Sequence, residues 1–161
     1  GLITSEPQKG KHVRQMTGKE IYDSYVVAGI LEGAGVAESL PLWTEANMET
    51  FRTVVRQMEG KISYATKLDE LAEIDELFHA TLFMACDNTR LVEMARTSCA
   101  TISKYLYYQH WITMFTPREY ADRHHAVAEA VYSRDVKHVE TALRDHYKET
   151  GLRMAQFGKE A

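Results

Sequence analysis

The chain has 161 residues, 45% of them hydrophobic and 26% charged, which is enough to bury the core of one domain. A formal net charge of −4 at pH 7 excludes a basic nucleic-acid-binding surface over the whole chain. The two cysteines are too few for a disulfide framework, so we expect reduced thiols and a cytoplasmic protein. We see no apolar run near the ~20 residues that cross a bilayer, and expect no membrane partner.

The first sixteen residues differ in pattern from the rest. Short apolar or alternating stretches at residues 1–3 and 12–14 flank a turn-forming, basic segment at residues 7–11. This pattern predicts two short strands joined by a basic turn. Because an isolated hairpin is marginal in water, the segment is either the edge of a larger unit or a flexible arm.

From Thr17 onward the pattern is helical. Capping boxes predict helix starts at Thr17 and Thr116, and Asn88 and Asp135 serve as further N-caps. We expect helices over residues 17–40, 44–59, 66–86, 88–106, 116–133 and 135–157. The predicted fold is therefore all-α: an antiparallel bundle of six to seven helices, preceded by a short β-hairpin. The interior glycines of the first helix either allow close packing or mark a weak helix: Gly29, Gly33 and Gly35.

Four polar side chains point toward the predicted core. Asp75 and His79 lie four apart on one helix, so they project to neighbouring points. His124 and His146 each lie at the centre of an apolar stripe on a later helix. A divalent transition metal is the simplest partner for all four, because imidazole and carboxylate suit zinc, nickel, manganese or iron.

A plainer interpretation competes with the metal. An inward histidine is more often a hydrogen-bonded core residue than a ligand, and an Asp/His pair at helical spacing is often a simple hydrogen bond. Spacing alone leaves both interpretations open. The remaining histidines show no such convergence, and we interpret them as ordinary: His12, His110, His125 and His138.

The same residues resemble a known family. Asp75-Glu-Leu-Phe-His79 with the later Asn88, then the helix of His124 and the turn at Asp135, are similar to the FCD domain. This is the C-terminal effector domain of FadR-subfamily GntR transcription regulators. The resemblance covers roughly residues 17–158. The first residues resemble the closing hairpin, or wing, of that family's winged helix-turn-helix.

The resemblance implies a domain organisation and a function. Residues 1–16 would be the remnant of a winged helix-turn-helix, and residues 17–161 an FCD-like ligand-binding and dimerisation domain. We expect a piece of a longer, bacterial-type regulator, a repressor, that forms a homodimer and binds operator DNA only when intact. Asp75, His79, His124 and His146 would hold a divalent metal, zinc by first choice, and a small carboxylic-acid effector would bind that metal.

Further residues follow from the family pattern and its departures. Leu31-Glu32 matches the family's first helix, but Ala28 stands where an arginine often pairs the acidic ligand. The ligand-binding candidates are Asn88, Tyr105, Arg96 and Arg134, with Lys104 a further replacement cation. Arg123 departs from the common acidic residue, and we expect it to be peripheral. The candidate DNA contacts in the intact protein are Lys9, Gly10 and Lys11, and the candidate dimer surfaces are the helix starting at Ile21 and the segment 105–111.

Two other functions stay open at this point. Three histidines and a carboxylate on a helical bundle could form a metalloenzyme site that activates water or oxygen. Glu73 and Glu76 flank Asp75 but project elsewhere, so the sequence offers no clear general base. The third possibility is a metal-free helical sensor in which the histidines only form hydrogen bonds.

Overall fold

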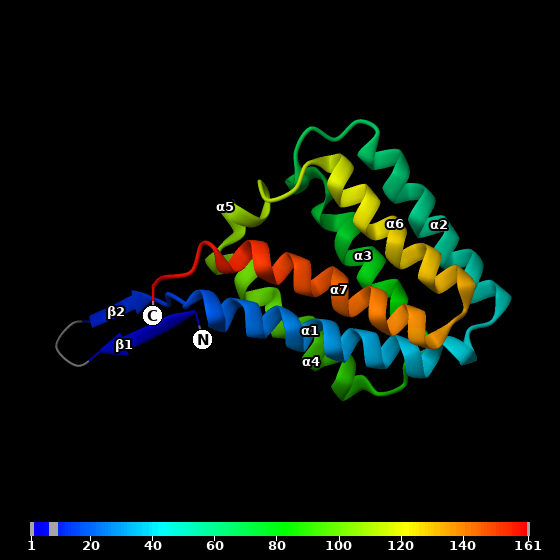
Figure 1. The fold of residues 1–161 in the computed structure, drawn as a ribbon, viewed down its shortest axis with the longest axis horizontal. Helices are drawn as coiled ribbons and strands as arrows, with labels where there is room; N and C mark the ends of the chain where they lie inside the picture. Colours follow the sequence, from blue (N-terminus) through cyan, green and yellow to red (C-terminus); the bar gives the residue numbers. More distant parts are fainter. Residues whose placement is uncertain (1, 7–9, 161) are drawn as a thin grey trace.

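The computed structural model describes residues 2–6 and 10–160. Strands β1 (Ile3–Glu6) and β2 (Gly10–Val13) pair antiparallel, with Ile3 opposite Val13. The hairpin projects from the end of the helical bundle where both termini lie (Figure 1). The predicted strands are confirmed, while the turn between them, including Lys9, lies outside the described residues. Side chains at residues 2–5 and 10–13 are exposed, so the hairpin buries little against this chain.

The predicted all-α fold is confirmed: within the described residues the chain contains seven α-helices and is 75% helical. The helices are α1 (Gly18–Ser39), α2 (Glu45–Ile62), α3 (Ala72–Leu82), α4 (Thr89–Thr101), α5 (Tyr108–Trp111), α6 (Pro117–Ser133) and α7 (Val136–Ala155). Short 3₁₀ turns, η1 (Leu40–Leu42) and η2 (Leu68–Leu71), precede α2 and α3. A π-helical turn, η3 (Ile102–Leu106), separates α4 from α5.

The helix starts follow local capping chemistry. Thr17 and Thr116 form the predicted capping boxes, in which the threonine hydroxyl accepts from the amide three residues later and the glutamate there accepts from the threonine amide. Asn88 and Asp135 cap α4 and α7 through their side-chain oxygens. Arg134, in the left-handed conformation at φ 55°, ends α6.

Two expected helices are shorter than the sequence indicated. The third was expected over residues 66–86, but α3 runs only from Ala72 to Leu82 and is preceded by η2. The fourth was expected to continue to Leu106, but the backbone changes to π-type hydrogen bonding at Ile102. The apolar periodicity continues through the 3₁₀ turn before α3 and the π-turn after α4, so it does not reveal where either helix ends. These ends depend on tertiary packing more than on local helix propensity.

The helices form two connected parts (Figure 1). The long α1 packs most extensively against α7, with the start of α1 beside the end of α7, and it also contacts α4. Helices α2, α3 and α6 cover the other side and enclose one large apolar core. The site described below lies where these parts meet.

Glycines allow α1 and α7 to pack closely. A Cβ on Gly29 would lie 2.8 Å from the Cβ of Tyr147, and one on Gly151 would lie 2.8 Å from the Cβ of Tyr25. Such distances are too short for any side chain, so the glycines permit the contact between the two helix backbones. The close-packing interpretation of the α1 glycines is the one that this geometry supports.

The expectation that no segment is apolar enough to cross a membrane was wrong by length and composition. Residues Gly18–Leu42 form a helical stretch of 25 residues that contains an 18-residue window with a mean hydropathy of 1.2. Its packing explains this apolarity, because 56% of that window is buried inside the protein. It is the central helix of the bundle, and it carries a buried glutamate, Glu32, toward the histidines.

The segment between the hairpin and α1 is fixed to the bundle at Met16. The Tyr107 hydroxyl donates to the Met16 carbonyl oxygen at 3.2 Å and accepts from the Met16 amide at 3.1 Å. The amide of Lys159 also donates to the Met16 carbonyl at 2.9 Å. The Met16 side chain is buried in a second, smaller cluster with Ile102 and Met154.

Candidate metal centre

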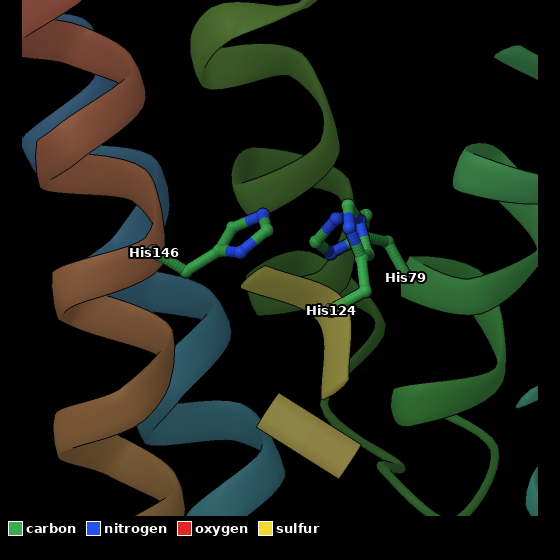
Figure 2. A group of neighbouring side chains, drawn as sticks. All are labelled: His79, His124 and His146. Atoms are coloured by element: carbon green, nitrogen blue, oxygen red, sulfur yellow. The ribbon is translucent and has the colours of Figure 1, made fainter. Parts of the chain in front are cut away.

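Three histidines from three helices converge on one point. His79 comes from α3, His124 from α6 and His146 from α7, and their rings share one space (Figure 2). One ring nitrogen from each lies within 4.8 Å of those of the other two. Zinc–nitrogen bonds of about 2.0–2.1 Å need ligand atoms somewhat closer than this, so small ring rotations would close the triad on an ion.

His124 is oriented by its backbone. Its Nδ1 lies 2.8 Å from the Tyr120 carbonyl oxygen, an acceptor that requires a proton on Nδ1. The other nitrogen, Nε2, lies 3.1 Å from Oδ1 of Asp75. In a neutral ring, Nε2 and the carboxylate would then be two acceptors facing each other, and a proton or a metal ion between them satisfies both. The spacing of Asp75 and His124 therefore fits a shared cation.

His79 is held from its far side by a residue of α1. Its Nδ1 lies 2.6 Å from Oε1 of Glu32, and the Tyr147 hydroxyl donates to Oε2 of the same carboxylate at 2.7 Å. With Nδ1 occupied, Nε2 is the nitrogen of His79 left to bind a metal. A carboxylate behind a ligating histidine is a common arrangement that fixes the ring and its tautomer.

His146 supplies the orphaned atom of the group. Its Nδ1 is buried and lacks a hydrogen-bond partner among the described residues. A buried, unsatisfied ring nitrogen is costly, and a metal ion is one partner that removes this cost. Together with the facing acceptors at His124, this orphan shows that the donor set fits a divalent metal.

The three histidine rings differ in the direction in which their pKa is shifted. Burial lowers the pKa of His124 and holds the pKa of His146 well below its ordinary value, the latter aided by nearby cationic side chains. Burial also acts against a charged His79, but the Glu32 carboxylate outweighs it and raises the pKa of His79 to about 9. Burial would raise the pKa of Asp75, yet the neighbouring His124 and His79 lower it. Neutral imidazoles and an ionised carboxylate are the forms that bind metals, so His124, His146 and Asp75 are ready to bind, whereas an ion would have to displace a proton from His79.

The triad lies in a cavity of about 240 Å³. Leu68, Phe83, Trp111 and Phe115 contribute apolar walls, and the cavity is smaller than the range of about 300–1,000 Å³ for drug-sized ligands. This volume suits a metabolite-sized molecule. The charged and polar side chains on its wall include those of Glu32, Asp75, Glu76, Arg96, Ser103, Lys104 and Arg123.

The four predicted ligand-binding residues do not all lie at the cavity. Arg96 lines the cavity. Asn88 is exposed at the start of α4, where its side chain accepts from the Leu91 amide. Tyr105 is 65% exposed to solvent. Arg134 donates to the Trp43 carbonyl and to Glu45 at the turn between α6 and α7.

Arg123, expected to be peripheral, is instead part of the cavity wall. Its side chain is 11% exposed and pairs with Glu149 at 2.7 Å. It also donates to the His146 carbonyl and the Thr150 hydroxyl, both at 2.6 Å, and its guanidinium stacks on Phe115. These contacts tie Arg123 of α6 to the backbone of α7 beside His146.

Sequence reasoning missed Glu32 and Tyr147 as site residues. Glu32 was noted only as part of a family pattern, although it is the one charged residue between Asp23 and Glu38. A carboxylate in the middle of an apolar, buried helix must find a partner, and that signal was available from the sequence. Tyr147 offered no such signal, because tyrosine is common at half-buried helix positions.

Comparisons with known proteins place this geometry in a family. The FCD domain model matches residues 23–149. The HTH-type transcriptional repressor RspR of Escherichia coli (strain K12) is 24% identical over 163 residues, covering 99% of this chain and 69% of that protein. YdfH of Shigella flexneri, an HTH-type transcriptional regulator, matches with the same identity and coverage.

Solved structures share the fold. A GntR family transcriptional regulator from Pseudomonas syringae pv. tomato str. DC3000 superposes with a TM-score of 0.71 at 19% identity, covering 97% of this chain and 64% of that one. E. coli McbR/YncC superposes with a TM-score of 0.77 at 14% identity, covering 98% of this chain and 74% of that one. The chain thus spans about two thirds of the length of the proteins it matches. RspR, YdfH and the Pseudomonas syringae protein are transcriptional regulators and not enzymes. Since the FCD model accounts for most of the sequence, this chain belongs to the FCD domain family.

Proposed function

We propose that this chain is the effector-sensing part of a bacterial GntR-family transcription regulator, a repressor that binds a small carboxylic acid through a divalent metal. The observation that carries the proposal is the convergence of three histidines within 4.8 Å in a cavity, with Asp75 against one of them. The relatives supply the regulatory context, since RspR is a transcriptional repressor.

Four residues would hold the metal: Asp75, His79, His124 and His146. Zinc is the first choice for three imidazoles and a carboxylate, with nickel, manganese or iron as alternatives. When bound, the metal supplies a Lewis-acidic anchor for a carboxylate at its open coordination positions. The chain's own groups prepare that anchor: Glu32 orients His79, the Tyr120 carbonyl orients His124, and the apolar walls exclude water.

Three cationic side chains also line the cavity, beside its three carboxylates. Arg123 lies within the wall, and Arg96 and Lys104 line the same space. These cations would take the place of the arginine that the family often has at the position of Ala28. In this chain the Ala28 side chain is fully buried. A small acid with its carboxylate at the histidines and its body against the apolar walls matches both the charge and the volume of the cavity.

Regulation requires that the effector prefer one conformation of the whole protein. In the intact regulator, residues 1–16 would complete a winged helix-turn-helix, with Lys9, Gly10 and Lys11 at its tip near DNA. Residues 17–161 would bind the effector and form the homodimer, through α1 or the segment 105–111. None of the helices that the structure describes precedes the hairpin, so we expect no tight sequence-specific binding of residues 1–161 to operator DNA in a shift experiment.

The first experiment is metal analysis of protein purified without chelator. We expect near one metal ion per chain in the wild type, and loss of the metal in the double variant His124→Ala plus His146→Ala. The control is His125→Ala, which removes a neighbouring, half-exposed histidine that pairs with Glu59. Equal metal content in all three proteins would overturn the site. No metal and no thermal stabilisation by zinc, nickel or manganese would show a metal-free sensor.

The second experiment identifies the effector class. We expect small carboxylic acids to raise the melting temperature of the metal-loaded protein, and uncharged analogues of the same size to have no effect. The acid should be recovered unchanged, whereas turnover would indicate the metalloenzyme. Stabilisation by acids in the double histidine variant would place the ligand elsewhere in the cavity.

A further inference from the structure

We propose that Glu32 is the positioning residue of the metal site: it fixes His79 and balances the charge of the ion. The proposal rests on the proposed metal site and assigns a role that neither the family pattern nor the histidine spacing predicts. Both carboxylate oxygens of Glu32 are used, one against Nδ1 of His79 at 2.6 Å and one by the Tyr147 hydroxyl at 2.7 Å.

Geometry defines the first part of this role. Glu32 is on α1, His79 on α3 and Tyr147 on α7, so one side chain joins three helices at the metal site. Its side chain is 4% exposed, and two hydrogen bonds hold it in place. A fixed carboxylate at Nδ1 keeps that nitrogen protonated and leaves the Nε2 lone pair of His79 directed to the ion.

Charge defines the second part. A divalent ion with Asp75 and three neutral imidazoles would leave one positive charge uncompensated in a buried place. Burying an unpaired charge is costly. The carboxylate of Glu32 brings the total of ion, Asp75 and Glu32 to zero before any effector binds. It does so without occupying a coordination position, so the positions needed by a ligand stay open.

Tyr147 gives the arrangement its stiffness. It follows His146 directly, so α7 supplies both a metal ligand and the donor that holds Glu32. Gly29, one turn before Glu32 on α1, lets the Tyr147 backbone approach. Glu32 therefore acts on the ion through His79.

The test measures metal affinity by competition with a chromophoric zinc chelator. We expect Glu32→Gln, which keeps the shape and removes the charge, to weaken zinc binding by about 10–100-fold. Tyr147→Phe, which keeps the charge and removes one hydrogen bond, should weaken it by less than Glu32→Gln does. The matched control is Glu76→Gln, because Glu76 lines the same cavity but its side chain is 68% exposed and pairs with Lys104. Zinc affinity in Glu32→Gln equal to that in Glu76→Gln would overturn the proposal.

A second readout does not depend on metal. In the proton spectrum of the metal-free wild type, the Nδ1 proton of His79 should appear far downfield and exchange slowly, because it is shared with a buried carboxylate. We expect it to move upfield in Glu32→Gln and to stay in place in Glu76→Gln. Absence of this resonance in the wild type would overturn the role of Glu32 even if zinc binds. If the resonance is present but the wild type binds no metal, the proposed metal-dependent function is refuted. The Glu32–His79 pair would then be a structural contact only, and the positioning role would fall with the metal site.

Discussion

Ionisable side chains line both ends of the cavity, but those at one end are buried and those at the other are exposed to solvent. At the deep end, Glu32 and His124 have side chains that are 4% exposed. At the outer end, Glu76 and Lys104 form an ion pair at 2.9 Å with side chains that are 68% and 50% exposed. Buried polar groups must each be satisfied, whereas water substitutes for any partner of an exposed one. We therefore expect substitutions at the deep end to change metal binding strongly and substitutions at the outer end to change it little.

Loading the deep end with metal should give the largest change in stability. With free zinc at a thousand times its dissociation constant, we expect the free energy of unfolding to rise by about 4 kcal/mol. Chelator should reverse the gain, and urea unfolding with and without zinc measures it. The same gain is expected in Lys104→Ala, at the outer end. If zinc does not stabilise the wild type, the deep end does not differ from the outer end in metal binding.

The second prediction concerns a thiol of the cavity wall. Burial, reinforced by the carboxylates of Glu32 and Asp75, raises the pKa of Cys99 from its ordinary value of 9.0 to about 12. A rise of three pH units means about a thousandfold less thiolate at any pH below 9, and so about a thousandfold slower alkylation. The rate should keep rising with pH beyond 9, where an ordinary thiol levels off. Mass spectrometry of Cys86→Ser after iodoacetamide treatment measures it, and a plateau near pH 9 would contradict it.

The third prediction tests the wall behind the deep end. Gly29→Ala would place a Cβ 2.8 Å from the Cβ of Tyr147. We expect a loss of about 1–3 kcal/mol in the free energy of unfolding, because the two helix backbones must separate. Gly60→Ala is the control, since a Cβ there meets no described atom within 4 Å and should stabilise the helix by up to about 1 kcal/mol. Similar gains in both variants would show that α1 and α7 tolerate the separation.

The smallest effect is expected at the outer end. Lys104→Ala removes the exposed partner of Glu76, and such surface pairs contribute about 0–1 kcal/mol. Zinc affinity should stay within twofold of the wild type. Chemical denaturation and the chelator competition described above measure the two quantities. A large loss of zinc affinity would mean that the outer end takes part in metal binding.

Much of the fold follows from local rules. The capping boxes at Thr17 and Thr116 and the caps at Asn88 and Asp135 start helices as predicted, because each is decided within four residues. The spacing of Asp75 and His79 and the central position of His124 in its stripe also placed these residues near one another. Helical periodicity is enough to orient a side chain toward the core.

Other features depend on contacts between distant segments. The π-turn at Ile102 and the half-buried Arg123 depend on contacts with distant residues that no local sequence pattern reveals. Tyr147 binds Glu32 across 115 positions of sequence. Asn88 was a ligand-binding candidate from the family pattern, but its side chain caps α4. Tyr105 was a candidate from the aromatic pattern, but its side chain faces solvent. Which residues reach a cavity is decided by how helices pack, and that is the part a single sequence does not show.

The attachment of Met16 has a mechanical consequence. Tyr107 belongs to the turn between η3 and α5, and its neighbours Lys104 and Tyr108 line the cavity. The segment after the hairpin is thus held in three ways: by its covalent connection to α1, by the hydrogen bond from Lys159, and by Tyr107, which lies next to the cavity wall. A movement of that wall either carries Met16 along or breaks two hydrogen bonds, at a cost of about 0.5–1.5 kcal/mol each. The Tyr107–Met16 contact therefore links the position of the hairpin's attachment point to the position of the cavity wall.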